Sequence, residues 1–103
     1  MREALKGHVD LLLLSVLEDD PVHGYGLVER LRERSDGAFD LAEGTVYPSL
    51  YRLERRRLVT SNWETVGGRR RRVYRLTSGG RSALERQRTE WHGFARAMEA
   101  VVR

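Results

Sequence analysis

No cysteine occurs in this chain, and proline occurs only twice among its 103 residues. The lack of cysteine excludes disulfide bonds, thiolate metal sites and a cysteine nucleophile. The longest apolar run, Leu11–Leu14, is bounded by Asp10 and Ser15 and falls far short of the ~20 apolar residues that span a bilayer. The first residues, Met1–Glu3, lack a signal-peptide pattern. We therefore expect a cytoplasmic protein that does not cross a membrane.

The arrangements that enzymes need are also missing. The sequence has no nucleophile–base pair with a recognisable spacing, no phosphate-binding loop and no cluster of metal ligands. Its three histidines, His8, His23 and His92, are far apart along the chain. Solvated or packed histidines are much commoner than a zinc site assembled from such residues across a dimer. We predict that the protein is not an enzyme and that it has no cofactor and no metal.

Charge is what the chain has in quantity, and it is unevenly distributed. Residues 52–75 contain nine arginines and two glutamates, whereas residues 1–51 contain five basic and ten acidic residues. Such a concentration of positive charge indicates a surface that binds a nucleic-acid duplex. The plainer alternative is that these arginines only keep exposed strands soluble. The length suits a single hydrophobic core.

Hydrophobic periodicity predicts three helices in the first half of the chain, at about 7–17, 23–34 and 43–57. The second and third helices each carry one apolar stripe. The first helix is apolar around almost its whole circumference, so it must be buried on more than one side. In a chain this small, we expect its second side to contact another copy of the protein.

A change of period after the third helix predicts a β-hairpin. Two alternating segments flank Gly67-Gly68, and a two-residue glycine loop favours a tight turn. This loop predicts a register in which Val59 faces Leu76 and Trp63 faces Arg72. One face of the hairpin is then expected to cover the core with Val59, Trp63, Tyr74 and Leu76.

The last predicted helix runs from Thr77-Ser78 to about Val102. About 25 residues at 1.5 Å each give roughly 37 Å, longer than this small core can cover. The apolar stripe beyond Trp91 therefore needs a partner, and we expect a homodimer built through the first and last helices. The residues predicted to form it are Leu11, Leu12, Leu14, Trp91, Phe94, Met98 and Val102.

Two helices followed by a hairpin form a winged helix-turn-helix. The predicted fold class is therefore mainly α with a small β-hairpin: a DNA-binding unit over residues 1–78 and a C-terminal dimerisation helix over residues 79–103, in one compact body. In such a fold the second helix of the pair enters the major groove, ~12 Å wide, and the wing follows the flanking backbone. The exposed side of the third helix is expected to offer Thr45, Tyr47, Ser49, Tyr51, Arg52 and Arg55 to phosphates and base edges.

Some of these side chains have alternative roles. Tyr47 and Tyr51 are four residues apart, so either one can pack against the second helix instead. On the wing, Arg69 and Arg70 beside the turn are the strongest phosphate candidates, and they supply affinity and salt dependence rather than specificity. Arg72 can instead stack on an aromatic neighbour.

Three segments together resemble the PadR family of bacterial transcription regulators. They are HGYG from His23, EGTVYPSLYRLE from Glu43, and GGRRRRVYRLT from Gly67. The resemblance extends over nearly the whole chain and is closest to short members with a single C-terminal dimerisation helix. It implies a winged-helix homodimer that binds a partly palindromic operator, usually represses, and is released by a small molecule or another signal.

The resemblance also implies roles for particular residues. The groove-reading segment is Thr45 to Arg52, the contact from the second helix is Tyr25, and the wing is Gly67 to Arg72, which includes Arg71. The alternative for Tyr25, judged from the sequence itself, is a buried packing role.

The C-terminal stripe also predicts an effector site. Aromatic and methionine side chains form adaptable apolar pockets, so Trp91, Phe94 and Met98 are expected to hold a planar aromatic compound between the last helices and the first helices of a dimer. The alternative is that Trp91 only fills the dimer seam. The expected function is sequence-specific, DNA-binding transcriptional regulation. The alternative function is a winged-helix module for protein–protein contact without specific DNA binding.

Overall fold

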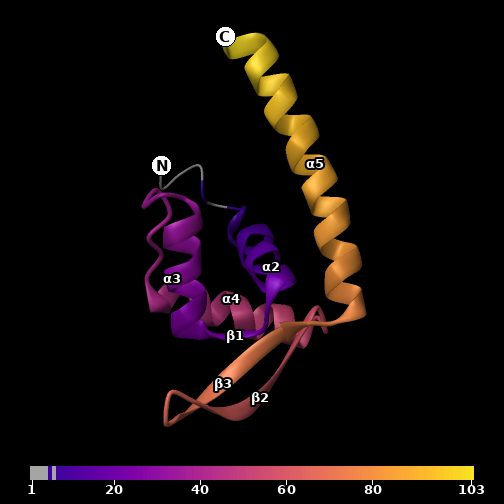
Figure 1. Cartoon of the computed structure of the whole chain (residues 1–103). Helices are drawn as coiled ribbons and strands as arrows, with labels where there is room; N and C mark the ends of the chain where they lie inside the picture. Colours follow the sequence, from indigo (N-terminus) through magenta and orange to yellow (C-terminus); the bar gives the residue numbers. More distant parts are fainter. Residues whose placement is uncertain (1–4, 6) are drawn as a thin grey trace.

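The computed structural model describes residue 5 and residues 7–103 (Figure 1). The start of the predicted DNA-binding unit, including the Met1–Glu3 segment that lacks a signal-peptide pattern, lies outside the described residues. The elements follow in the order α2 (Val9–Asp19), β1 (Val22–His23), α3 (Gly24–Arg34), α4 (Glu43–Arg55), β2 (Val59–Val66), β3 (Arg69–Leu76) and α5 (Ser78–Val102).

The ends of the helices follow from local chemistry. α2 ends at Asp19, two residues later than predicted, and the extended Asp20 precedes Pro21. α4 ends at Arg55, two residues earlier than predicted. Arg57 has a positive φ of 63°, and the backbone N–H of Leu58 donates to the carbonyl of Leu53, which closes the helix.

The sheet confirms the predicted hairpin register and adds a strand. β2 and β3 pair antiparallel from Val59 opposite Leu76 to Val66 opposite Arg69, as the two-residue glycine turn predicted. β1 pairs with the other edge of β3, giving the order β1-β3-β2, and it places His23 opposite Val73. The sequence did not predict β1, because two residues are too few to show an alternating pattern.

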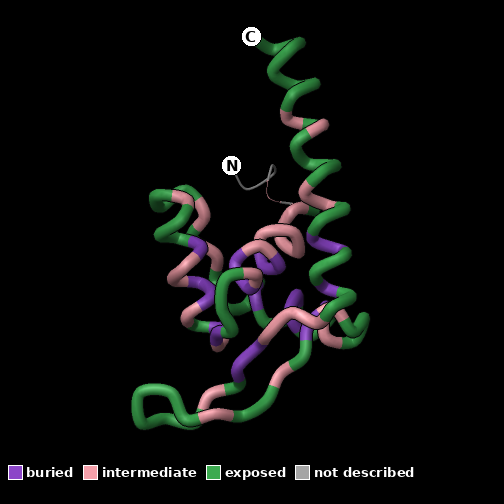
Figure 2. The backbone as a smooth tube through the Cα atoms, turned by 45° about the vertical axis from the view of Figure 1, so that its right-hand side comes forward, coloured by how far each residue is buried: buried purple, intermediate pink, exposed green. Residues whose placement is uncertain are grey.

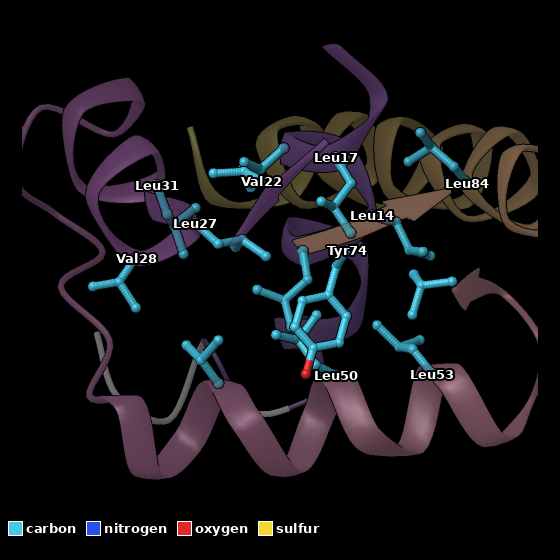
Figure 3. Close-up of a cluster of buried hydrophobic side chains, with 14 of the residues drawn as sticks. Leu14, Leu17, Val22, Leu27, Val28, Leu31, Leu50, Leu53, Tyr74 and Leu84 are labelled. Carbon is cyan, nitrogen blue, oxygen red and sulfur yellow. The ribbon is translucent and has the colours of Figure 1, made fainter. Parts of the chain in front are cut away.

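α2 lies at the centre of the core and packs against α3, α4 and α5. Its side chain Leu14 is completely buried beside residues of the other elements (Figure 3). Tyr74 of β3 lies over α4 beside Leu50 and covers the core from the sheet side. Two predictions are wrong here. Leu14 belongs to the core and presents no surface to a partner, and Trp63, expected over the core, is 54% exposed.

α5 begins beside the hairpin and then leaves the body of the molecule (Figure 1). The Thr77 hydroxyl accepts a hydrogen bond from the Gly80 backbone N–H and caps the helix. Ala83 and Leu84 in its first turns are buried, whereas the C-terminal half is largely exposed (Figure 2). Within the part of the chain that the structure describes, no helix combines the length and apolar character required to cross a bilayer.

Candidate nucleic-acid interface

The exposed face of α4 carries an aromatic ring covered by a cation. Tyr51 is 63% exposed, and the guanidinium carbon of Arg55 lies 5.7 Å from its ring centroid. Thr45 is also exposed near the start of the helix. The opposite face holds α4 in the core through Val46 and Leu50, both fully buried. Because the buried face anchors α4 in the core, the side chains of Thr45, Tyr51 and Arg55 on its other face point into solvent.

Ser49 does not belong to that exposed face. It is 5% exposed, and its hydroxyl accepts a hydrogen bond from the Arg52 guanidinium at 3.3 Å. The expectation that Ser49 faces DNA is therefore wrong, because the residue lies one turn from Val46 and Leu53 on the inward side of α4. Arg52 itself turns toward α2, where its guanidinium lies 3.0 Å from the Asp10 carboxylate.

The two tyrosines of α4 take different positions. Tyr47 packs against the start of α3, so closely that a Cβ atom on Gly24 would lie 2.5 Å from its ring. Tyr51 stays free of the body, which settles which of the pair packs against α3. Tyr25, in the first turn of α3, is 46% exposed, so the alternative of a buried residue is wrong. Its ring lies 6.4 Å from that of His23 and nearly parallel to it.

His23, immediately before α3, is partly buried beside the wing. Burial lowers the pKa of His23 below its usual value, and the nearby Arg71 guanidinium lowers it further. A neutral imidazole is therefore favoured beside the Arg71 cation.

Burial also raises the pKa of Tyr74, which keeps its phenol protonated in the core.

The arginines of the wing differ in their surroundings. Arg69 and Arg70 are exposed beside the Gly67-Gly68 turn, and neither forms an ion pair with any residue that the structure describes. Arg71 is half-buried. Arg72 donates from Nε to the Ser61 hydroxyl at 2.9 Å, so this fourth arginine is held against its own hairpin.

A polar chain joins the wing to α4. The Ser61 hydroxyl donates to the Glu54 carboxylate at 2.6 Å, and the Arg72 guanidinium lies 3.9 Å from the same carboxylate. On the other face of the hairpin, Arg75 donates to the Glu64 carboxylate at 2.7 Å. The contacts of Glu54 with Ser61 and Arg72 connect α4 directly to the wing, whereas the contact of Arg75 with Glu64 joins β3 to β2.

The sequence does not predict the roles of Asp10 and Glu54. Each forms an ion pair with an arginine that is distant along the chain, and a single acidic residue gives no periodic signal. Among residue 5 and residues 7–103, no three acidic or histidine side chains gather in a way that would hold a metal ion.

A groove of about 560 Å³ lies on the other side of the molecule, between α2, α3 and α5. Leu11, Leu12 and Trp91 line it, and the His8 ring lies edge-on to Trp91 at 5.3 Å. Phe94 lines a neighbouring hollow with Trp91, between α2 and α5. Met98 and Val102 lie beyond both, on the projecting part of α5, where they are 48% and 69% exposed.

Comparisons with known proteins agree on one family. Residues 13–86 match the transcriptional regulator PadR-like family. The chain is 40% identical, over its whole length and 87% of the relative, to the transcriptional regulator Rv3488 of Mycobacterium tuberculosis (strain ATCC 25618 / H37Rv).

Solved structures show the same similarity. A PadR family transcription regulator from hypervirulent Clostridium difficile R20291 superimposes with a TM-score of 0.84 at 34% identity, covering 94% of this chain and all of that one. A transcriptional regulator from Clostridium thermocellum gives a TM-score of 0.90 at 25% identity, covering 100% of this chain and 98% of the other.

Proposed function

The chain belongs to the PadR family of transcriptional regulators, and on this premise we propose that it is a repressor which binds a partly palindromic operator as a homodimer. The family assignment makes it a DNA-binding transcriptional regulator with a winged-helix fold, and not an enzyme. In this proposal the regulator acts in the cytoplasm, where the DNA is. The observation that carries the proposal is the connection of the exposed α4 face to the arginine-bearing wing through the polar contacts among Glu54, Ser61 and Arg72.

In this proposal α4 enters the major groove and the wing follows the adjacent backbone. Thr45 and Tyr51 on the exposed face contact base edges or phosphates, and Arg52 does so after it leaves Asp10. Ser49 is excluded by its burial. Tyr47 belongs to the same groove-reading helix. The residues proposed to contact the sugar–phosphate backbone of the DNA are Tyr25, Arg69, Arg70 and Arg71.

The homodimer is supported by the apolar surface that one chain leaves uncovered. Trp91, Phe94 and Met98 are 40%, 53% and 48% exposed along one stripe of α5. Leu11 and Leu12 on α2 are partly exposed at the groove beside this stripe. Covering these side chains with a second copy removes apolar surface from water. It also gives the two recognition helices that a two-fold operator requires.

We further propose that release from DNA follows the binding of a planar aromatic effector near Trp91. The groove and the neighbouring hollow meet at this side chain, and the volume of about 560 Å³ suits a small ligand. Within a single chain, Phe94 lines the hollow beside Trp91 and would contact the ligand there. Met98 lines neither hollow, so in this proposal it contacts the ligand only in the dimer, where the α5 helices of two copies lie together. The ligand must prefer a dimer whose recognition helices are wrongly spaced for the operator.

The proposal is tested by fluorescence anisotropy with a labelled duplex across a salt series. The native protein should bind with a steep loss of affinity as salt rises, because binding releases counterions from phosphates. Replacing Arg69 or Arg70 by alanine should lower the log–log slope by about one per lost contact. Arg96→Ala, on the side of α5 away from the apolar stripe, makes the same change of charge and should leave the slope unchanged. Salt-tolerant binding to a protein, with no duplex binding, would support the protein–protein module instead.

A further inference from the structure

Trp63 is an exposed aromatic residue in the most basic part of the molecule. It lies on β2 and is 54% exposed, whereas Val66, another exposed apolar residue of this strand, lies on the opposite face of the hairpin. An indole that contributes so little to the core has no evident folding role. Its neighbours Arg70 and Arg72 are cationic, and such a concentration of positive charge favours a polyanionic partner.

Two arginines of the opposite strand flank the indole. The guanidinium carbons of Arg70 and Arg72 each lie 5.7 Å from the Trp63 ring centroid. Arg72 stands directly opposite Trp63 in the register, and Arg70, opposite Thr65, lies two residues before Arg72 on the same face. Cation–π attraction of this kind holds guanidinium groups in place before any ligand arrives.

The face that carries Trp63 is the one directed toward α4. Ser61, two residues before Trp63 and therefore on the same face, donates to Glu54 of α4. Closer to the core, Tyr74 of the same face packs over α4 (Figure 3). A duplex lying against the exposed side of α4 would therefore meet this face of the wing.

We propose that Trp63 and Arg70 form a sugar–phosphate clamp, in which the indole packs on a deoxyribose of the DNA backbone and Arg70 binds an adjacent phosphate. Arg72, tied to Ser61 and Glu54, keeps the indole oriented from the other side. The inference rests on the proposed DNA binding and assigns a wing contact to an apolar side chain. Deoxyribose suits it because a sugar offers C–H surface beside a negative charge, which matches an indole beside a guanidinium.

The clamp predicts different signatures for its two members. Trp63→Ala should weaken duplex binding about tenfold without changing the log–log salt slope, because the lost contact is apolar. Arg70→Ala should weaken binding and lower the slope by about one. If Trp63 only positions the arginines, its removal should lower the slope as well, and that result would overturn the proposal. Val66→Ala shortens a smaller exposed apolar side chain on the opposite face of the hairpin and should leave affinity unchanged.

A fluorescence measurement tests the contact itself. In a Trp91→Phe chain that still binds duplex, Trp63 is the sole tryptophan, and acrylamide quenching reports its exposure. Saturating duplex should lower the quenching constant at least twofold, and an unchanged constant would overturn the clamp. Native protein that binds duplex while Trp63→Ala binds equally well would overturn the clamp alone. Native protein that binds no duplex would overturn both the clamp and the proposed function.

Discussion

The Arg52 guanidinium lies 3.0 Å from the Asp10 carboxylate and joins the recognition helix α4 to α2. Asp10 also lines the hollow that contains Trp91 and Phe94. One ion pair therefore connects the proposed DNA-reading face with the proposed dimer and effector side. Arg52, expected from the sequence to reach a guanine, is held by a carboxylate of its own chain in the absence of DNA.

Asp10→Asn should therefore strengthen duplex binding. The substitution removes the charge that competes with DNA for Arg52, and an exposed pair of this kind is worth about 0.2–1 kcal/mol, or roughly 1.4- to fivefold in affinity. Fluorescence anisotropy at fixed salt measures the change. Asp19→Asn, which breaks the pair with Arg34 elsewhere on α2, is the matched control. Equal affinities for the two variants would show that Asp10 does not restrain Arg52.

Arg52→Ala tests whether this side chain reads a base after its release. We expect a relaxed preference at one base pair of the operator, by about 1–3 kcal/mol if the contact is bidentate. Competition between duplexes that differ at single positions measures it. Unchanged selectivity in this variant would show that Arg52 reads no base and only pairs with Asp10 between α4 and α2.

Gly80→Ala should destabilise the fold. A Cβ atom at Gly80 would collide with the backbone carbonyl of Leu58, where α5 begins against the hairpin. Overpacking of this kind costs about 1–3 kcal/mol of the free energy of unfolding, measured by urea denaturation. Gly93→Ala adds a Cβ to α5 in open space and should stabilise the helix by about 0.5–1 kcal/mol. Equal free energies of unfolding for the two variants would refute the close approach of Gly80 to the Leu58 carbonyl.

The dimer prediction is tested by sedimentation. Native protein should be a dimer at micromolar concentration, and Leu12→Asp combined with Met98→Asp should be a monomer, because both changes place charge in an apolar seam. Ala100→Asp on the opposite side of α5 should leave the dimer intact. A folded native monomer, or a double variant that associates normally, would contradict the assignment.

The sequence predicted the hairpin well because Gly67-Gly68 allows only a narrow choice of turns, and the turn determines which residues pair. The sequence predicted the wrong burial for residues whose exposure depends on which other elements pack against them. Trp63 has the alternation of a core residue, but the hairpin extends past the body, and the neighbours of the indole there are the guanidinium groups of Arg70 and Arg72. Ser49 is small enough to enter the core side of α4, a position that hydrophobic periodicity assigns to apolar residues.

The effector proposal depends on Trp91. Planar aromatic compounds should quench tryptophan fluorescence in the native protein and in Trp63→Phe, but not in Trp91→Phe, because the ligand lies against Trp91. Quenching that survives in Trp91→Phe and vanishes in Trp63→Phe would place the ligand on the wing. No response to any compound would favour a packing role for Trp91 in the dimer seam.

Selection of binding sites from a pool of random duplexes tests DNA recognition by a dimer most directly. The native chain should enrich a sequence with two half-sites related by two-fold symmetry and centred about one helical turn apart, or a multiple of it, ~34–36 Å per turn. The enriched duplex should bind more tightly than the starting pool at the same salt concentration. Enrichment of no sequence, or of a single half-site without symmetry, would contradict the account.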